Sequence, residues 1–240
     1  MRLFELDITT KPIKFSGNLQ KNLTKKNISA KKGIDLLGKG ITAYAVSKKS
    51  KPHEVKRISV DSQAPKFDPY LKFVKIAVKN QDNIAFPRIY EVKIFRKKPA
   101  RYQTDRDKYI VYVEMEKLHS WKELGWGQWS QLMHSTFGKG IREFWAERVP
   151  PQTKMRMAER YSELIASYLA KPIAMTRSFG PMQDMDLMKA LVKLRGPLKS
   201  VELDLHEENL MFRVTKYGVQ PVVVDPYYYK ESKRTDLEPF

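Results

Sequence analysis

The stretch Asp204-Leu205-His206-Glu207-Glu208-Asn209, with Asp225 sixteen residues after Asn209, decides the fold prediction. Two apolar segments follow Asn209, Leu210-Met211-Phe212 and Val219 to Val224, and a polar turn separates them. Short apolar runs on either side of a turn predict a β-hairpin. Such a hairpin returns the chain to the loop from which it started, so we expect Asp225 to lie at a strand end close to Asn209.

The residue types in this stretch are those of a site that binds a hard cation. The spacing from Asp204 to Asn209 allows one loop to present a carboxylate to an acceptor group and a carboxamide oxygen to Mg²⁺. Asp and Asn also favour turns because their side chains bond to nearby backbone, so ordinary turn residues are the alternative interpretation. The spacing alone is common by chance, whereas the hairpin that ends in apolar residues and Asp225 is much rarer.

Upstream of this stretch, residues 33–60 predict a strand, a glycine-containing turn, a strand, a turn and a third strand. The turn contains Gly38-Lys39-Gly40. These glycines could also belong to a plain hairpin turn that has no role in binding. The third strand alternates from Glu54 to Val60 and contains Lys56.

The remaining pattern predicts an α+β protein with two lobes. Asp68-Pro69 is a helix start, and apolar residues recur on one face over residues 69–80. Two alternating segments, 89–95 and 109–115, complete a five-stranded antiparallel sheet with one helix. Further helices are expected over 152–170 and 183–195. The expected domains are a basic extension at 1–30, a sheet lobe at 31–117 and a reduced, mainly helical lobe at 118–240.

Composition restricts the partners and the compartment. The chain has 45 Lys and Arg against 27 Asp and Glu, a net charge of +18, and residues 1–60 hold 14 basic and 4 acidic side chains. This charge attracts polyanions such as nucleic acid, nucleotides or acidic proteins. A solvated basic surface that keeps the protein soluble is the alternative interpretation. The chain has no cysteine, no long apolar stretch and no recognisable secretion signal. We therefore expect a cytoplasmic protein that does not contact a membrane.

These motifs together resemble the protein-kinase-like superfamily, and most closely the early serine/threonine kinases of T7-like bacteriophages. The matching stretches are Leu37-Gly38-Lys39-Gly40 with Ala43-Tyr44, then Val55-Lys56, then Asp204 to Phe212, then Asp225-Pro226. The resemblance covers roughly residues 33–230. It implies a two-lobed kinase-like fold, ATP and Mg²⁺ as cofactors, and host proteins as substrates in the host cytoplasm.

The resemblance also implies a role for each matching residue. Asp204 would accept or orient the proton of the substrate hydroxyl, and Asn209 and Asp225 would bind Mg²⁺. Lys56 would contact the α- and β-phosphates beside the backbone of Gly38 and Gly40. A hinge from Glu114 through Glu116 to Leu118 would bind adenine through backbone groups.

Several features depart from the usual kinase pattern. Residues 62–85 contain no Glu to pair with Lys56, and Glu91 is a possible substitute. Glu202 stands where kinases have a histidine, and Pro226-Tyr227 replaces Phe-Gly after the metal-binding aspartate. Fifteen residues follow Asp225, which implies that the platform for peptide substrates is reduced.

Two other functions are therefore compatible with the sequence. One is a kinase-fold protein with weak or no catalysis that binds a host protein or nucleic acid through its basic surface. The other is a small-molecule kinase, which the Asp-Leu-His order of the loop favours. The tryptophans at 121, 126, 129 and 145 suggest base stacking, but at near-helical spacing they are more often core residues or interface anchors.

Overall fold

The computed structural model describes residues 13–14, 34–39, 43–62, 68–96, 109–138, 154–170 and 184–229. The chain divides into two compact units. Unit 1 consists of Met1–Asp82 and Pro87–Leu118, and unit 2 consists of Asn83–Phe86 and His119–Phe240. Residues 83–86 therefore belong to unit 2, although the residues before and after them in the sequence belong to unit 1.

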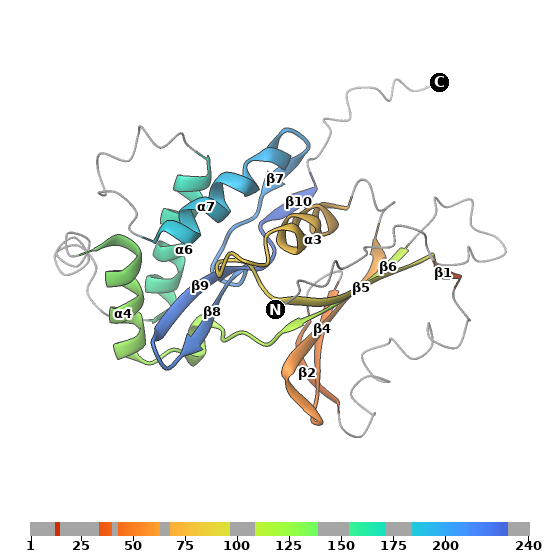
Figure 1. The fold of residues 1–240 in the computed structure, drawn as a ribbon, viewed down its shortest axis with the longest axis horizontal. Coiled ribbons are helices and arrows are strands. Elements are labelled where there is room, and N and C mark those ends of the chain that lie inside the picture. Colours follow the sequence, from red (N-terminus) through yellow and green to blue (C-terminus); the bar gives the residue numbers. More distant parts are fainter. Residues whose placement is uncertain are drawn as a thin grey trace. The chain divides into compact units, whose positions relative to one another are not determined.

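Unit 1 contains a six-stranded sheet whose strand order is β1-β5-β6-β4-β3-β2 (Figure 1). Strands β2 to β6 pair antiparallel, which confirms the predicted α+β class and five-stranded antiparallel sheet. The additional strand β1 lies inside the segment predicted as an extension, and it pairs parallel with β5 at the sheet edge. The strands are β1 (Ile13–Lys14), β2 (Ile34–Lys39), β3 (Ala43–Lys48), β4 (Lys51–Ser62), β5 (Ile89–Arg96) and β6 (Tyr109–Glu116).

The helix of unit 1 is α3 (Pro69–Lys79), close to the predicted range. Asp68 caps it, since its Oδ1 accepts a hydrogen bond from the Leu71 N–H at 3.0 Å, and Pro69 occupies the first turn. The Arg57 guanidinium lies 3.5 Å from the centre of the Tyr70 ring, so α3 packs on the sheet face to which Arg57 points. Consecutive strand residues point to opposite faces, and Lys56 therefore points to the other face.

The glycine motif differs from its prediction. Gly38 lies inside β2, paired with Ala45 of β3, and the register shifts between Leu36 and Gly38. The prediction that Gly38 belongs to the turn is therefore wrong. A glycine within a strand commonly marks a bulge, and this one does so. Gly40 lies outside the described residues.

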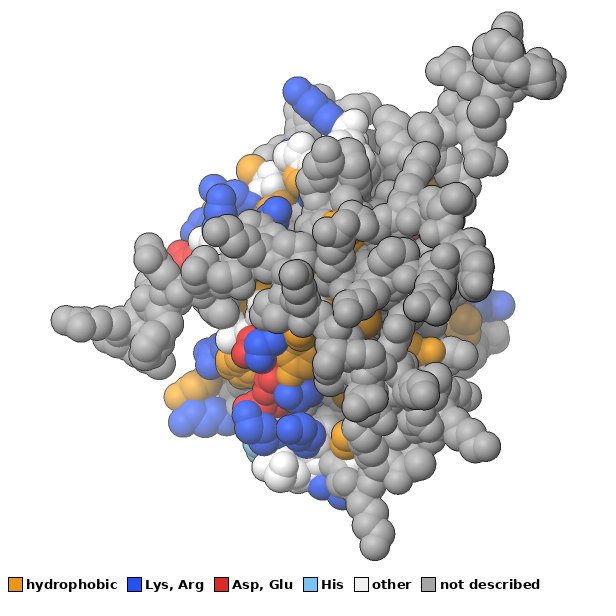
Figure 2. All heavy atoms as spheres, turned by 90° about the vertical axis from the view of Figure 1, so that its right-hand side faces the viewer, with side chains coloured by type: hydrophobic (Ala, Val, Ile, Leu, Met, Phe, Trp, Pro, Cys, Tyr) orange, Lys and Arg blue, Asp and Glu red, His pale blue; other side chains and the backbone are white. Residues whose placement is uncertain are grey.

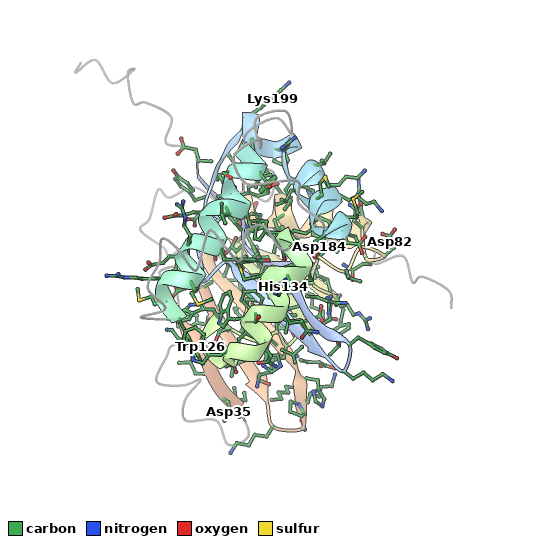
Figure 3. The ribbon with its side chains drawn as sticks, turned by 90° about the vertical axis from the view of Figure 1, so that its left-hand side faces the viewer. Asp35, Asp82, Trp126, His134, Asp184 and Lys199 are labelled. Carbon is green, nitrogen blue, oxygen red and sulfur yellow. The ribbon has the colours of Figure 1, made fainter. Side chains whose placement is uncertain are left out.

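Unit 2 contains the helices α4 (Trp126–Phe137), α6 (Lys154–Ala170) and α7 (Met185–Leu194), the last two near their predicted ranges. Their core is aromatic: the Trp129 ring lies edge-on to Tyr161 and Phe212, with ring centres 6.0 and 5.5 Å away. Figure 3 labels Trp126 at the start of α4. Its exposed fraction is 51%. The interpretation of the tryptophans as core or interface anchors is therefore confirmed for Trp129, which is fully buried, and stays a prediction for Trp126. Trp145 lies outside the described residues.

Four short strands of unit 2 form two separate two-stranded sheets. The predicted hairpin is present as β8 (Leu210–Thr215) and β9 (Gly218–Val223). The sequence did not predict the other pair, β7 (Val201–Leu203) with β10 (Tyr227–Tyr229). Two 3-10 turns, Trp121–Glu123 and Gly196–Lys199, precede α4 and β7.

The segment 83–86 is bonded to the β8–β9 hairpin within unit 2. The Val223 N–H donates to the Ala85 carbonyl at 3.0 Å. The Arg213 guanidinium donates to the carbonyls of Ile84 and Phe86 at 2.5 and 3.2 Å. Asn83 Nδ2 donates to the Asp186 carbonyl of α7 at 2.9 Å. These bonds explain why the segment belongs to unit 2 although α3 and β5 on either side belong to unit 1.

The described surface is rich in positive charge. Figure 2 shows Lys and Arg side chains gathered around a few acidic ones on the face in view. Helix α3 illustrates this bias, because it carries Lys72, Lys75 and Lys79 and no acidic residue. None of the described helices has the length and apolar character needed to cross a bilayer.

Candidate functional site

The predicted loop lies where a long hairpin of unit 2 is interrupted. The chain from β7 to β8 and the chain from β9 to β10 pair with each other before and after the interruption. Between the pairs Leu203–Tyr227 and Leu210–Val223, one chain has the six residues 204–209 and the other has the three residues 224–226. The longer side must therefore leave the sheet as a loop, and the shorter side carries Asp225.

Backbone hydrogen bonds tie this loop to the opposite chain at both of its ends. The Asp204 N–H donates to the Pro226 carbonyl at 2.8 Å, and the Val224 N–H donates to the Asn209 carbonyl at 3.1 Å. These two bonds flank Asp225 on either side. The structure thus brings Asp204, Asn209 and Asp225 together, in the way that the predicted hairpin implied.

The Asn209 side chain has a fixed orientation. Its Nδ2 donates to the Asp204 carbonyl at 2.6 Å and lies 3.0 Å from His206 Nε2. The carbonyl accepts hydrogen bonds only, so this contact identifies the nitrogen end of the carboxamide. Oδ1 therefore remains as an acceptor, and no donor to it occurs among the described residues.

The backbone of Asp204 is fixed while its carboxylate stays accessible. Its N–H and its carbonyl are both used, as described above, but its side chain is 41% exposed. Its Oδ1 lies 3.8 Å from His206 Nε2. A carboxylate held in this way can accept a proton from, or orient, a hydroxyl that approaches from solvent.

His206 is a part of the loop to which the sequence assigned no role. Its Nδ1 accepts from the Glu208 N–H at 3.2 Å, while its Nε2 contacts Asn209 and lies near Asp204. The ring thus contacts three other residues of the loop. The signal in the sequence that could have indicated these contacts is the position of His206 between Asp204 and Asn209.

Lys56 lies in unit 1 and has a carboxylate partner from a neighbouring strand. Lys56 of β4 pairs in register with Glu114 of β6, and its Nζ donates to Glu114 Oε2 at 2.8 Å. It also bonds to the Tyr112 hydroxyl, and that hydroxyl donates to the same Oε2 at 2.6 Å. The suggested substitute, Glu91, instead pairs with Lys93 at 2.5 Å. The idea that Glu91 takes this place is wrong, because its own strand supplies a nearer lysine.

Glu114 is a buried carboxylate, only 8% exposed. Burial by itself raises the pKa of Glu114, but hydrogen bonds from Lys56 and Tyr112 outweigh it and lower the pKa to about 2. Burial and the Glu114 carboxylate both raise the pKa of Tyr112, so its phenol keeps its proton and donates. The three groups therefore form an ionised lysine–glutamate pair bridged by a neutral tyrosine.

The predicted hinge residues lie at the end of β6. The Glu116 N–H donates to the Arg88 carbonyl at 2.9 Å, and the Lys117 N–H donates to the His53 carbonyl at 2.8 Å. Leu118 is buried at the boundary of unit 1. Two backbone donors of this segment are thus already used inside the sheet, and adenine binding here stays a prediction. Gly38 is exposed and its Cβ position is open, with no atom within 4 Å.

The possible metal ligands are oxygen atoms of unit 2. Within the described ranges, no group of three or more His, Asp or Glu residues could hold a metal ion. The expected pair is smaller, the Asn209 carboxamide oxygen and the Asp225 carboxylate. Mg²⁺ is commonly held by one or two protein oxygens together with waters and phosphates, so this donor set fits it.

Comparisons with known proteins add no assignment to this geometry: no family model matches the chain, and no curated protein matches it.

Proposed function

We propose that the protein is an ATP- and Mg²⁺-dependent phosphotransferase with a kinase-like fold, and that its acceptors are serine or threonine hydroxyls of host proteins. The observation that carries the proposal is the double bonding of loop 204–209 to residues 224 and 226 around Asp225. It supports the proposal because one interrupted hairpin then carries the solvent-accessible Asp204 carboxylate and two oxygen ligands for a metal ion, from Asn209 and Asp225. Phosphoryl transfer needs mainly such positioning and charge neutralisation.

In this proposal each residue has one task. Asp204 orients the acceptor hydroxyl and takes its proton, while Asn209 and Asp225 hold the metal. Lys56 of unit 1 binds phosphate oxygens of the nucleotide. Bound Mg²⁺ supplies neutralisation of the phosphate charge.

The first experiment measures nucleotide binding. Thermal unfolding of the intact protein is followed with MgATP, and with ATP in EDTA. The proposal expects MgATP to raise the melting temperature, and expects Asp225→Asn to abolish that increase. A matched control is Glu208→Gln, because Glu208 is an exposed carboxylate of the same loop with no assigned task. An equal increase for Asp225→Asn and for the wild type would contradict the assigned metal ligand.

The second experiment measures transfer. The protein is incubated with [γ-³²P]ATP and a cell lysate, and labelled proteins are counted for the wild type, Asp204→Asn and Glu208→Gln. Removal of the base is expected to lower the labelling rate by about 10²–10⁴-fold. Labelling that persists undiminished in Asp204→Asn would rule out the assigned base. Turnover of aminoglycosides or amino alcohols, with no labelled protein, would identify a small-molecule kinase instead.

A binding protein without catalysis is the second candidate, and the lysine-only charge of α3 favours it. It predicts tight binding to nucleic acid that weakens steeply with salt, no melting-temperature increase with MgATP, and no effect of Asp204→Asn. One reason for this candidate was that Lys56 lacked an acidic partner. Glu114 supplies that partner, and phosphotransfer is therefore the better supported function.

A further inference from the structure

We propose that Glu114 and Tyr112 are positioning residues that hold Lys56 from within the sheet and replace an acidic partner on helix α3. The inference rests on the proposed role of Lys56 in binding the nucleotide. It assigns to Glu114 a task for its side chain, in place of the hinge task that the sequence suggested for its backbone.

The geometry places all three groups on one face of two adjacent strands. Lys56 and Glu114 face each other in the register of β4 and β6, and Tyr112 lies two residues from Glu114 on the same side. One carboxylate oxygen, Glu114 Oε2, receives both Lys56 at 2.8 Å and Tyr112 at 2.6 Å. The other oxygen, Oε1, lies 3.6 Å from Lys51 Nζ. The hydrogen bonds of Lys51 go to Glu54, at 3.0 and 2.7 Å, so the Glu114 carboxylate is held through Oε2, and it holds Lys56 in turn.

Tyr112 has a second function in this arrangement. Its ring packs against a small apolar cluster on the same face, Val46, Ile58 and Ile110. The Lys56 ammonium lies 5.1 Å from the centre of that ring, so the ring flanks the lysine while the hydroxyl bonds to it. The apolar contact fixes the ring, and the fixed ring limits the positions that Lys56 can adopt.

Helix α3 cannot provide the usual acid. It contains no Asp or Glu, and its contact with Arg57 places it on the face opposite to Lys56. A kinase-like site in which a helix carries the acid loses the lysine contact when that helix moves. Here the contact depends on strand register, so Lys56 is oriented before any nucleotide binds.

The arrangement leaves a donor for the ligand. An ammonium group has three N–H donors. Among the described residues, Lys56 uses two of them, for Glu114 and for the Tyr112 hydroxyl. The third is available to a phosphate oxygen, and the two occupied donors determine its direction.

The test measures the freedom of Lys56 directly, by its acylation rate with a water-soluble amine reagent, resolved by peptide mass spectrometry. Glu114→Gln removes the ionic partner and Tyr112→Phe removes only the hydroxyl. Glu91→Gln is the matched control. Glu91 of β5 pairs in register with Glu114 of β6, but its carboxylate binds Lys93. We expect Glu114→Gln to raise the Lys56 rate about tenfold and Tyr112→Phe about threefold, as loss of a charged or a neutral hydrogen bond implies.

The control must show the reciprocal pattern. Glu91→Gln should raise the rate of Lys93 and leave that of Lys56 within about twofold, since each carboxylate restrains its own lysine. If Glu114→Gln raises the acylation rates of Lys56 and Lys93 by similar factors, the substitution loosens the whole sheet, and the inference is overturned. An unchanged Lys56 rate in both Glu114→Gln and Tyr112→Phe would also overturn it. Tyr112→Phe keeps the packed ring, so it remains informative if Glu114→Gln fails to fold.

Kinetics separate this inference from the proposed function. A positioning role predicts that Glu114→Gln raises the KM for ATP about tenfold more than Glu91→Gln does, measured at a temperature at which both variants are fully folded. If Lys56→Ala leaves nucleotide binding intact, the proposed function of Lys56 fails while the acylation pattern still decides whether Glu114 holds it. If Lys56→Ala abolishes binding and Glu114→Gln leaves both the acylation rate and KM unchanged, the positioning inference alone fails.

Discussion

Glu114 stays ionised in a buried position because its Oε2 accepts hydrogen bonds from Lys56 and Tyr112. Its pKa falls from 4.5 to about 2 in the folded protein. A carboxylate with a lowered pKa stabilises the fold at pH values above its unfolded pKa, and this contribution is lost as the pH falls through the folded pKa. The pair should therefore stabilise the protein fully above about pH 4.5 and progressively less toward pH 2.

This behaviour is tested by urea unfolding of the wild type and Glu114→Gln at a series of pH values. The difference in unfolding free energy should be about 1.5–3 kcal/mol at pH 7, the range for a hydrogen bond to a charged group. It should shrink between pH 4.5 and pH 2, the interval between the two pKa values. Glu91→Gln, whose carboxylate is 39% exposed, should differ from the wild type by less than about 1 kcal/mol. A difference for Glu114→Gln that is constant with pH would refute the ionised pair.

Asn209 shows how a single carboxamide organises the loop. Asn209→Asp keeps the shape of the side chain but removes the donor that bonds to the Asp204 carbonyl. It also leaves two acceptors facing each other, so we expect a loss of about 1–3 kcal/mol in unfolding free energy. Calorimetry measures it, with Glu208→Gln as the control in the same loop. Equal stability of Asn209→Asp and the wild type would show that the Nδ2 contact does not hold the loop.

At the level of elements, the turn of the β8–β9 hairpin depends on glycine. Gly218 has a φ of 142°, a region that residues with a side chain rarely adopt, and an added Cβ would lie 2.6 Å from Gln131 Nε2 of α4. Gly218→Ala should therefore lower the unfolding free energy by about 1–3 kcal/mol. The Gln131→Ala background should recover only the part due to the clash. Full recovery would mean that backbone strain at Gly218 is negligible.

The sequence predicted the elements that have a strong local pattern. Strands β4, β5 and β6 alternate, α3 has a capping aspartate followed by proline, and α6 and α7 show an apolar stripe. Strands β7 and β10 were missed because each has only three residues, and they form only through their mutual pairing across the interrupted hairpin. Strand β1 was missed for the same reason, since two residues carry no periodicity.

The site was predictable only where its residues are close together in the sequence. The hairpin signal was enough to place Asp225 beside the loop, because the spacing is local in sequence. The partner of Lys56 was not predictable, because Glu114 lies 58 residues away and becomes a neighbour only through the order of β4 and β6 in the sheet. Gly38 was misassigned to a turn because a glycine that creates a bulge and a glycine in a turn look alike in sequence.

At the level of the whole molecule, segment 83–86 makes unit 2 discontinuous in sequence. Arg213 is its main side-chain contact, with bonds to the carbonyls of Ile84 and Phe86 and to Gln220 Oε1. Arg213→Met should loosen the segment while keeping the apolar part of the side chain. We expect the Val223 amide, which bonds to the Ala85 carbonyl, to exchange its hydrogen at least about tenfold faster.

The Phe212 amide provides the internal reference for this measurement, because it bonds to the His119 carbonyl rather than to the segment. Its exchange rate should not change. Faster exchange at both amides would mean that Arg213 stabilises the hairpin as a whole and not its bond to the segment.

The discontinuity also determines the order in which the nascent chain can mature. Ile84 leaves the ribosome 129 residues before Arg213. Strands β5 and β6 are synthesised before Arg213, so they can complete the sheet of unit 1 first. At that stage segment 83–86 still lacks its partners in the β8–β9 hairpin. Contacts between residues so distant in sequence form slowly. Unit 2 is therefore the last part of the protein to gain its full hydrogen bonding, because the carbonyls of Ile84 and Phe86 lack their Arg213 partner until residue 213 has been synthesised.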